Sequence, residues 1–114
     1  MHVYGIKNCN TVKKALTWLD EHHISYTFHD FKKEGIAEAR LKEWEKELGW
    51  EKLLNKRGTT WRKIPAAVQE TIVDGPSACR FMQENTSSIK RPVIESAKGL
   101  LLGFDENEYS GFFS

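Results

Sequence analysis

The sequence predicts an α/β fold, a four-stranded mixed sheet with helices on its faces. Two observations lead to this prediction. The first 30 residues have the pattern of a strand, a helix and a strand, and two short apolar segments flank a turn at Lys98-Gly99 near the other end. A strand–helix–strand unit makes its strands parallel with a right-handed crossover, whereas a hairpin makes them antiparallel. The two together give a sheet of mixed direction.

The first strand is predicted at residues 2–6, which are mostly apolar. A helix is expected from Thr11 to His22, because its apolar residues follow the spacing of one helical face. These residues are Val12, Ala15, Leu16 and Leu19. Apolar side chains then alternate with polar ones from residue 24 to residue 29, which predicts the second strand.

The middle of the chain has helical patterns. The apolar residues of the three expected helices are Ala37, Leu41, Trp44 and Leu48, then Val68, Ile72 and Val73, then Phe81 and Met82. Gly49 is the expected cap of the first helix and Pro65 suits the start of the second. Gly75-Pro76 is expected to end that helix, and Ser77 to cap the third. Residues 55–60 are expected to form a loop.

Composition limits the classes of function. The length of 114 residues predicts a single domain over 1–114. The net charge of +1 argues against direct nucleic-acid binding. No segment resembles a signal peptide or is long and apolar enough to span a bilayer. We therefore expect a cytoplasmic protein without membrane contacts, and a monomer.

Cys9 is the main candidate for a reactive residue. It lies between the predicted end of a strand and the start of a helix, where unsatisfied N–H groups and the helix dipole stabilise an anion. Such a position lowers the pKa of a thiol and favours the thiolate, which is the nucleophile. The alternative is a small core residue at a strand end, but the polar neighbours Asn8 and Asn10 argue for exposure.

The residue three positions after Cys9 is Val12, where a dithiol redox motif would have its second cysteine. Any disulfide chemistry at Cys9 must therefore use an outside thiol such as glutathione. Cys79, beside apolar residues on a predicted helix, is interpreted as a buried structural thiol. A resolving role for Cys79 would require the fold to bring it close to Cys9.

Three arginines fall in predicted loops or strand starts: Arg57, Arg62 and Arg91. Guanidinium groups recognise carboxylates and oxyanions, although a single arginine is more often a solvated surface charge. Pro92, before a Val-Ile strand, is a candidate for a cis peptide bond. The four histidines form no cluster, so no metal site is expected.

Three parts of the chain resemble the arsenate reductase (ArsC) and Spx family. They are Val3–Thr11 (VYGIKNCNT) with the KKA that begins at Lys13, Leu54–Thr60 (LNKRGTT) and Ile89–Val93 (IKRPV). The similarity covers nearly the whole chain and is closest to the small YffB-like branch. It implies a thioredoxin-like fold with a helical insertion at about 36–86.

The resemblance also implies roles for particular residues. Cys9 takes the place of the nucleophile, Arg57 and Arg91 those of the anion-binding arginines, and Pro92 that of the cis proline. With Asn10 and Thr11, the arginines and the proline form the expected anion or glutathione site. Glutathione is the expected co-substrate, and no tightly bound cofactor is expected.

Three functions follow from the resemblance. The first is a glutathione-dependent thiol–disulfide reductase with a single nucleophilic cysteine. The second is an arsenate reductase that uses glutathione, with glutaredoxin as a further partner. Related enzymes of this second type have a histidine at Gly5, a serine at Val12 and a third arginine in the region 102–105, and these departures count against arsenate turnover. The third is a transcription regulator that, like Spx, binds RNA polymerase.

Overall fold

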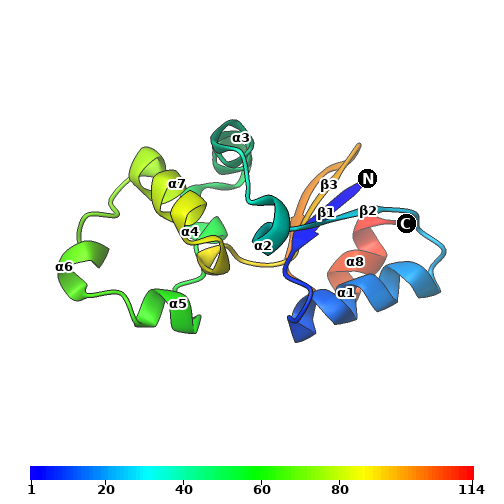
Figure 1. The fold of residues 1–114 in the computed structure, drawn as a ribbon. Coiled ribbons are helices and arrows are strands. Elements are labelled where there is room, and N and C mark those ends of the chain that lie inside the picture. Colours follow the sequence, from blue (N-terminus) through cyan, green and yellow to red (C-terminus); the bar gives the residue numbers. More distant parts are fainter. The chain divides into compact units, whose positions relative to one another are not determined.

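The computed structural model describes residues 1–114, which form two compact units. The first unit comprises Met1–Phe31 and Arg91–Ser114, and the second comprises Lys32–Lys90. Figure 1 shows the elements in chain order. The insertion expected at about 36–86 lies within the second unit, and the description of 1–114 as a single domain stays a prediction. No helix is both long and apolar enough to cross a membrane.

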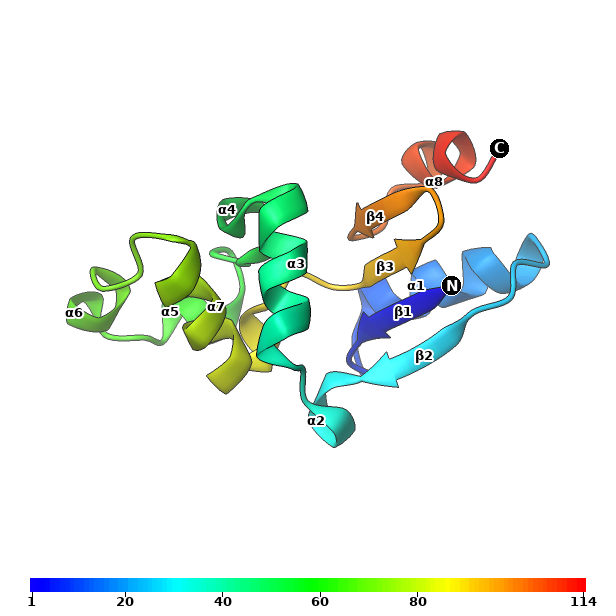
Figure 2. The same ribbon diagram turned by 90° about the horizontal axis from the view of Figure 1, so that it is seen from above.

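The first unit is built on a four-stranded sheet. Its elements are β1 (His2–Gly5), α1 (Asn10–Glu21), β2 (Thr27–Asp30), β3 (Val93–Ser96), β4 (Gly99–Leu102) and α8 (Glu106–Phe112). The strand order is β2-β1-β3-β4, as Figure 2 shows, with β1 parallel to β2 and the other two pairs antiparallel. The predicted mixed sheet, formed by a crossover unit and a hairpin, is confirmed.

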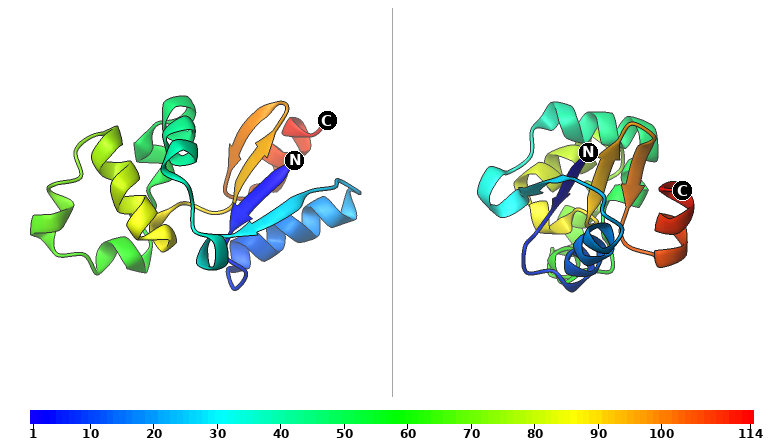
Figure 3. Two further views of the ribbon diagram at one scale, coloured as in Figure 1. Left: turned by 45° about the horizontal axis from the view of Figure 1, so that its top comes forward. Right: turned by 90° about the vertical axis from the view of Figure 1, so that its right-hand side faces the viewer.

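One face of this sheet carries the core of the first unit. Phe28, Val3, Ile94 and Leu101 lie in register across the four strands, so their side chains share a face. Helices α1 and α8 cover that face (Figure 3). The helix residues in the same core are Ala15, Trp18, Leu19 and Tyr109. The apolar face predicted for the first helix is therefore the face that packs on the sheet.

The second strand begins at Thr27, later than the alternation from residue 24 predicts. The reason is the end of α1. The Ile24 N–H donates to the carbonyl of Leu19 at 2.9 Å, and His23 has a positive φ of 57°, so the chain is still closing the helix there. Thr27 is the first of these residues to bond towards β1, to the carbonyl of Met1.

The second unit is mainly helical. Its elements are α2 (Phe31–Glu34, which begins at the last residue of the first segment), α3 (Glu38–Leu48), α4 (Trp50–Leu53), α5 (Thr59–Arg62), α6 (Ala66–Gln69), α7 (Gly75–Glu84) and the 3-10 turn η1 (Thr86–Ser88). Helices α3 and α7 pack against each other. Gly49 ends α3 with a φ of 87°, as predicted.

A helix starts after Pro65 as predicted, but the prediction that it carries Ile72 and Val73 as well as Val68 is wrong. Helix α6 ends at Gln69, and the side chains of Val68 and Val73 are 42% and 69% exposed. The hydroxyl of Thr71 donates to the carbonyl of Val68 at 2.6 Å, which competes with continuation of the helix. The expected loop over 55–60 is also shorter, because α5 begins at Thr59 and includes Arg62.

The cap of α7 also differs from the prediction. Gly75 and Pro76 form its first turn, where proline is well tolerated, and Asp74 is the N-cap. The Asp74 carboxylate accepts from the Ser77 N–H at 2.9 Å, and the Ser77 hydroxyl accepts from the Asp74 N–H at 3.2 Å. Ser77 is thus the third helical residue of a capping box rather than the cap itself.

Candidate active site around Cys9

Cys9 is the N-cap residue of α1, at the end of the loop that follows β1. Its backbone is extended, with φ −108° and ψ 124°, and its carbonyl accepts the helical bond from the Lys13 N–H at 2.9 Å. The side chain is half-buried and the thiol is free. A side chain at an N-cap lies beside the unsatisfied N–H groups of the first helical turn.

The pKa of the Cys9 thiol is set by opposing effects. Partial burial raises it, but the neighbouring Val12 N–H, the Arg91 side chain with its positive charge, and the Thr11 N–H lower it. The net pKa lies below the usual value of a thiol. Each stabilising group favours the thiolate, so the site raises the population of the nucleophilic form.

Arg91 reaches this thiol because of the topology of the sheet. Strand β3 runs antiparallel to β1, and Val93 near its start pairs with Tyr4 near the end of β1. The loop that carries Cys9 leaves β1 at that same end. Arg91 and Pro92 immediately precede β3, and the peptide bond between them is cis. The Pro92 carbonyl accepts from the Gly103 N–H at 2.9 Å, which ties the segment to the end of β4.

The two other site residues predicted at the start of α1 differ in their effect on the Cys9 thiol. Thr11 acts through its backbone N–H, whereas the exposed side chain of Asn10 makes no hydrogen bond in the structure. The N–H of Val12 is a contributor that the sequence does not single out, because Val12 stands out there as an apolar helix residue and as a position without a second thiol. Helix capping could have identified it, since the second and third helical N–H groups lie beside the N-cap side chain.

Arg57 lies in the second unit, in the loop between α4 and α5, and its side chain is exposed. This loop has local order. The Arg57 N–H donates to the Asn55 side-chain oxygen at 3.2 Å, and the ammonium group of Lys56 lies over the rings of Trp50 and Trp61 at 5.3 and 5.8 Å. The anion-binding role of Arg57 stays a prediction from the sequence.

Cys79, on α7 of the second unit, has the environment of a structural thiol. It is 1% exposed, and burial, together with the negative charge of Glu45, raises the pKa of its thiol. A buried thiol with a raised pKa is a poor nucleophile at neutral pH. The prediction that Cys79 is buried is therefore confirmed.

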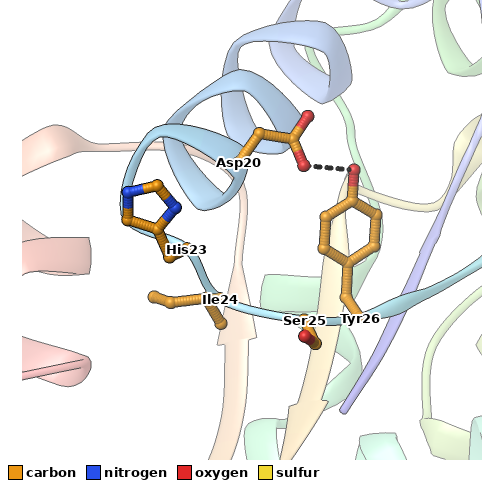
Figure 4. Close-up of a pocket in the computed structure, with 5 residues that line it drawn as sticks. All are labelled: Asp20, His23, Ile24, Ser25 and Tyr26. Atoms are coloured by element: carbon orange, nitrogen blue, oxygen red, sulfur yellow. Dashed lines mark hydrogen bonds between the residues drawn. The ribbon is translucent and has the colours of Figure 1, made fainter.

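A separate hollow lies at the other end of α1 from Cys9. It has a volume of about 580 Å³, and Figure 4 shows its lining residues, Asp20, His23, Ile24, Ser25 and Tyr26. The Tyr26 hydroxyl donates to Asp20 at 3.1 Å, and burial and this neighbour raise the pKa of Tyr26. No thiol or guanidinium lines this hollow, so it is not part of the Cys9 site. The structure also brings together no group of three or more side chains suited to hold a metal ion.

The arrangement around Cys9 combines a thiol of lowered pKa with a neighbouring cation. The helical N–H groups favour the thiolate form, and the Arg91 guanidinium supplies donors for an anionic group on an incoming molecule. This is the chemistry of a nucleophile that attacks sulfur or another electrophile carried by an anion.

Comparisons with known proteins identify the family of the chain. The model of the ArsC family matches residues 4–112. An uncharacterized protein of Haemophilus influenzae is 44% identical over 112 residues, which cover 98% of this chain and 97% of that protein. The global transcriptional regulator Spx of Staphylococcus haemolyticus is 28% identical over 107 residues, 92% of this chain and 80% of that one.

Two solved structures are similar over nearly the full chain. The structure of a YffB protein is 44% identical with a TM-score of 0.93, covering 99% of this chain and 98% of that one. An arsenate reductase (ArsC) related protein from Brucella melitensis is 47% identical with a TM-score of 0.77, covering 99% and 93%. The fold, the family model and these identities agree, and the chain belongs to the ArsC family.

Proposed function

We propose that this protein is a glutathione-dependent thiol–disulfide reductase in which Cys9 is the only nucleophile. The observation that carries the proposal is the lowered pKa of the Cys9 thiol, caused by Val12, Arg91 and Thr11 against the effect of burial. A site of this kind acts in the cytoplasm, where glutathione keeps thiols reduced.

The reaction proceeds in two exchanges. The Cys9 thiolate attacks the glutathione sulfur of a mixed disulfide between glutathione and a substrate thiol, forming a Cys9–glutathione disulfide and releasing the substrate thiolate. A second glutathione thiolate then attacks that glutathione sulfur, which releases glutathione disulfide and restores the Cys9 thiolate. The net change is the reduction of the mixed disulfide by one glutathione thiolate, which yields the substrate thiolate and glutathione disulfide.

Two features of the chain support a single-thiol mechanism. Val12 stands three residues after Cys9, so the first helical turn offers no resolving thiol. Cys79 is buried and its thiol pKa is raised, so it is a weak competitor. In the proposed reaction, Arg91 binds a carboxylate of glutathione, and its effect on the Cys9 pKa supports this role.

To test this, the reduced protein is mixed with glutathione disulfide, and the mass of the product is measured by mass spectrometry. We expect one glutathione per chain, located on Cys9 by peptide mapping, and its removal by added glutathione. Cys9→Ser abolishes the adduct, and Cys79→Ser is the matched control that keeps it. An unmodified wild-type chain, or an adduct that persists in Cys9→Ser, contradicts the proposal.

Arsenate reduction is the second candidate, because an arginine beside a thiolate also suits a small oxyanion. It is distinguished by arsenate-dependent oxidation of NADPH in the presence of glutathione, glutathione reductase and glutaredoxin. Turnover that requires both arsenate and Cys9 would replace the thiol–disulfide activity as the main function. A regulatory role like that of Spx predicts instead that purified RNA polymerase binds wild-type protein and Cys9→Ser equally.

A further inference from the structure

Two histidines meet on the face of the sheet opposite α1 and α8. On β1, His2 is next to Val3, whose side chain lies in the core, so the His2 side chain lies on the other face. On β2, His29 follows Phe28 in the same way. The parallel pairing of β1 with β2, visible in Figure 2, brings the two imidazoles together. The pair cannot be found from spacing in the sequence, because 27 positions separate the two residues.

The two rings face each other through one nitrogen each. Nδ1 of His2 lies 2.8 Å from Nε2 of His29, and the ring planes are inclined by 43°. A hydrogen bond between two imidazoles needs an N–H on one ring and a nitrogen lone pair on the other, so a single proton lies between them. Two nitrogens with ligand chemistry therefore converge on one small space.

The neighbouring side chains orient this pair and add negative charge. The buried Tyr4 ring stacks on His29, with the centroids 4.5 Å apart and the planes 13° apart. The Tyr4 hydroxyl donates to the Glu95 carboxylate at 3.1 Å, and Glu95 pairs directly with His2 across β1 and β3. The His2 side chain is exposed and that of His29 is partly exposed, so an ion can reach the pair from solvent.

We propose that His2 and His29 together bind one divalent transition-metal ion, such as Zn²⁺, through Nδ1 and Nε2 respectively. Imidazole nitrogen suits Zn²⁺, Ni²⁺ and Cu²⁺, whereas Mg²⁺ and Ca²⁺ prefer oxygen. The ion takes the place of the shared proton, which moves to the other nitrogen of the ring that donated it. Both imidazoles stay neutral, and water completes the coordination because no third side chain suited to a metal lies with them.

The distance between the two nitrogens fits this ligand. Nitrogens bound to Zn²⁺ lie about 2.0–2.1 Å from the metal, so two neighbouring ligands are roughly 2.9–3.4 Å from each other. The present separation of 2.8 Å has to grow by only about 0.1–0.6 Å, with a turn of the exposed His2 ring. The bound ion would join β1 to β2, and a ligand that binds only the folded state stabilises it.

The test is a titration of tag-free Cys9→Ser protein with ZnCl₂, followed by calorimetry and by NMR of the histidine side chains. The substitution removes the reactive thiol, which would otherwise compete for zinc. The chain has four histidines. We expect one Zn²⁺ per chain and saturable shifts of the His2 and His29 ring signals, with those of His22 and His23 unchanged. MgCl₂ at the same concentration should cause no such shift.

Histidine variants locate the ligands independently of the NMR assignment. In the Cys9→Ser background, His2→Gln and His29→Gln should each weaken Zn²⁺ binding by about tenfold or more, since even an outer-shell partner of a metal ligand contributes that much. The matched control is His23→Asn, which removes an exposed histidine at a positive φ that asparagine tolerates, and it should leave binding unchanged. Zn²⁺ should also raise the melting temperature, and this rise should be lost in both glutamine variants.

The absence of saturable shifts at the His2 and His29 rings would overturn the proposal. Undiminished binding in His29→Gln would do so too, because His2 would then bind the ion without its partner. An equal loss of binding in His23→Asn would indicate nonspecific attraction of zinc to surface histidines. Since every titration lacks the Cys9 thiol, each of these failures leaves the proposed thiol–disulfide activity untouched.

Discussion

The side chain of Val12 fills the space next to Gly5. A Cβ atom placed on Gly5 would lie 2.9 Å from one Val12 methyl carbon, closer than real Cβ contacts allow, and 3.5 Å from the other. Val12 is fully buried, and its β-branched side chain has little rotamer freedom. The residue at the end of β1 and the third helical residue of α1 therefore restrict each other.

Gly5→Ala is predicted to destabilise the protein by about 1–3 kcal/mol, since the added methyl group overpacks the contact with Val12. Urea denaturation of the wild type, both single variants and Gly5→Ala/Val12→Ala measures the coupling. The double variant should be less destabilised than the sum of the two single variants, because alanine at 12 makes room for the new methyl group. Simple additivity would show that the two positions do not compete for space.

Arg91→Gln is predicted to raise the pKa of the Cys9 thiol. Burial of the thiol remains, while the guanidinium hydrogen bond and its positive charge are lost. Iodoacetamide alkylates only the thiolate, so its rate between pH 5 and pH 10 follows the thiolate fraction. The pH at the midpoint of this rate profile is the pKa of the thiol. Lys98→Gln removes a cation from the hairpin turn of the same unit and serves as the control. An unchanged midpoint in Arg91→Gln would mean that the helical N–H groups alone hold the thiolate.

Cys9 should also make stability depend on pH. The pKa of its thiol is lowered in the folded state, so the thiolate stabilises the fold. This stabilisation is fully present above the pKa of the unfolded thiol, near 8.5, and is lost as pH falls through the pKa of the folded state. The difference in free energy of unfolding between wild type and Cys9→Ser should therefore grow as pH rises through that window. A difference that is constant or shrinks with pH would contradict the lowered pKa.

Tyr109→Phe should destabilise the first unit by about 1–3 kcal/mol. The Tyr109 side chain is fully buried, and its hydroxyl donates to the carbonyl of Gly103, which the variant leaves without that partner. Thermal unfolding measures the loss. Tyr26→Phe removes a hydroxyl whose bond to Asp20 is exposed, and it should have a clearly smaller effect.

Asp74→Ala should lower the unfolding temperature by removing the carboxylate that accepts from the Ser77 N–H and hydroxyl in the capping box at α7. Asp74→Asn keeps a side-chain acceptor, so it should lower the unfolding temperature less than Asp74→Ala does. Bonds from the Ser77 side chain and backbone hold the pKa of the Asp74 carboxyl below its usual value. The stabilisation is thus present above the usual aspartate pKa and lost as pH falls through the lower folded value. Equal melting of both variants would contradict the capping role.

Sequence patterns predicted best the elements whose apolar residues follow a regular spacing. The apolar spacing of Val12, Ala15 and Leu19 specified one helical face, and the structure buries that face on the sheet. The hairpin was equally clear, since two apolar segments flanked a glycine turn. Predictions failed in the segment 64–77, where Thr71 and Asp74 use side-chain hydrogen bonds that hydrophobic periodicity does not detect.

By itself, the sequence determined the α/β class, the mixed sheet and the position of Cys9 at the start of α1, because periodicity and helix-start chemistry are local properties. The absence of a second thiol in that turn was also visible at Val12. Only the tertiary structure decided that Arg91, 82 positions later in the chain, bonds to the Cys9 thiol. The antiparallel pairing of β3 with β1 brings them together, and such pairing depends on long-range register rather than on any local pattern.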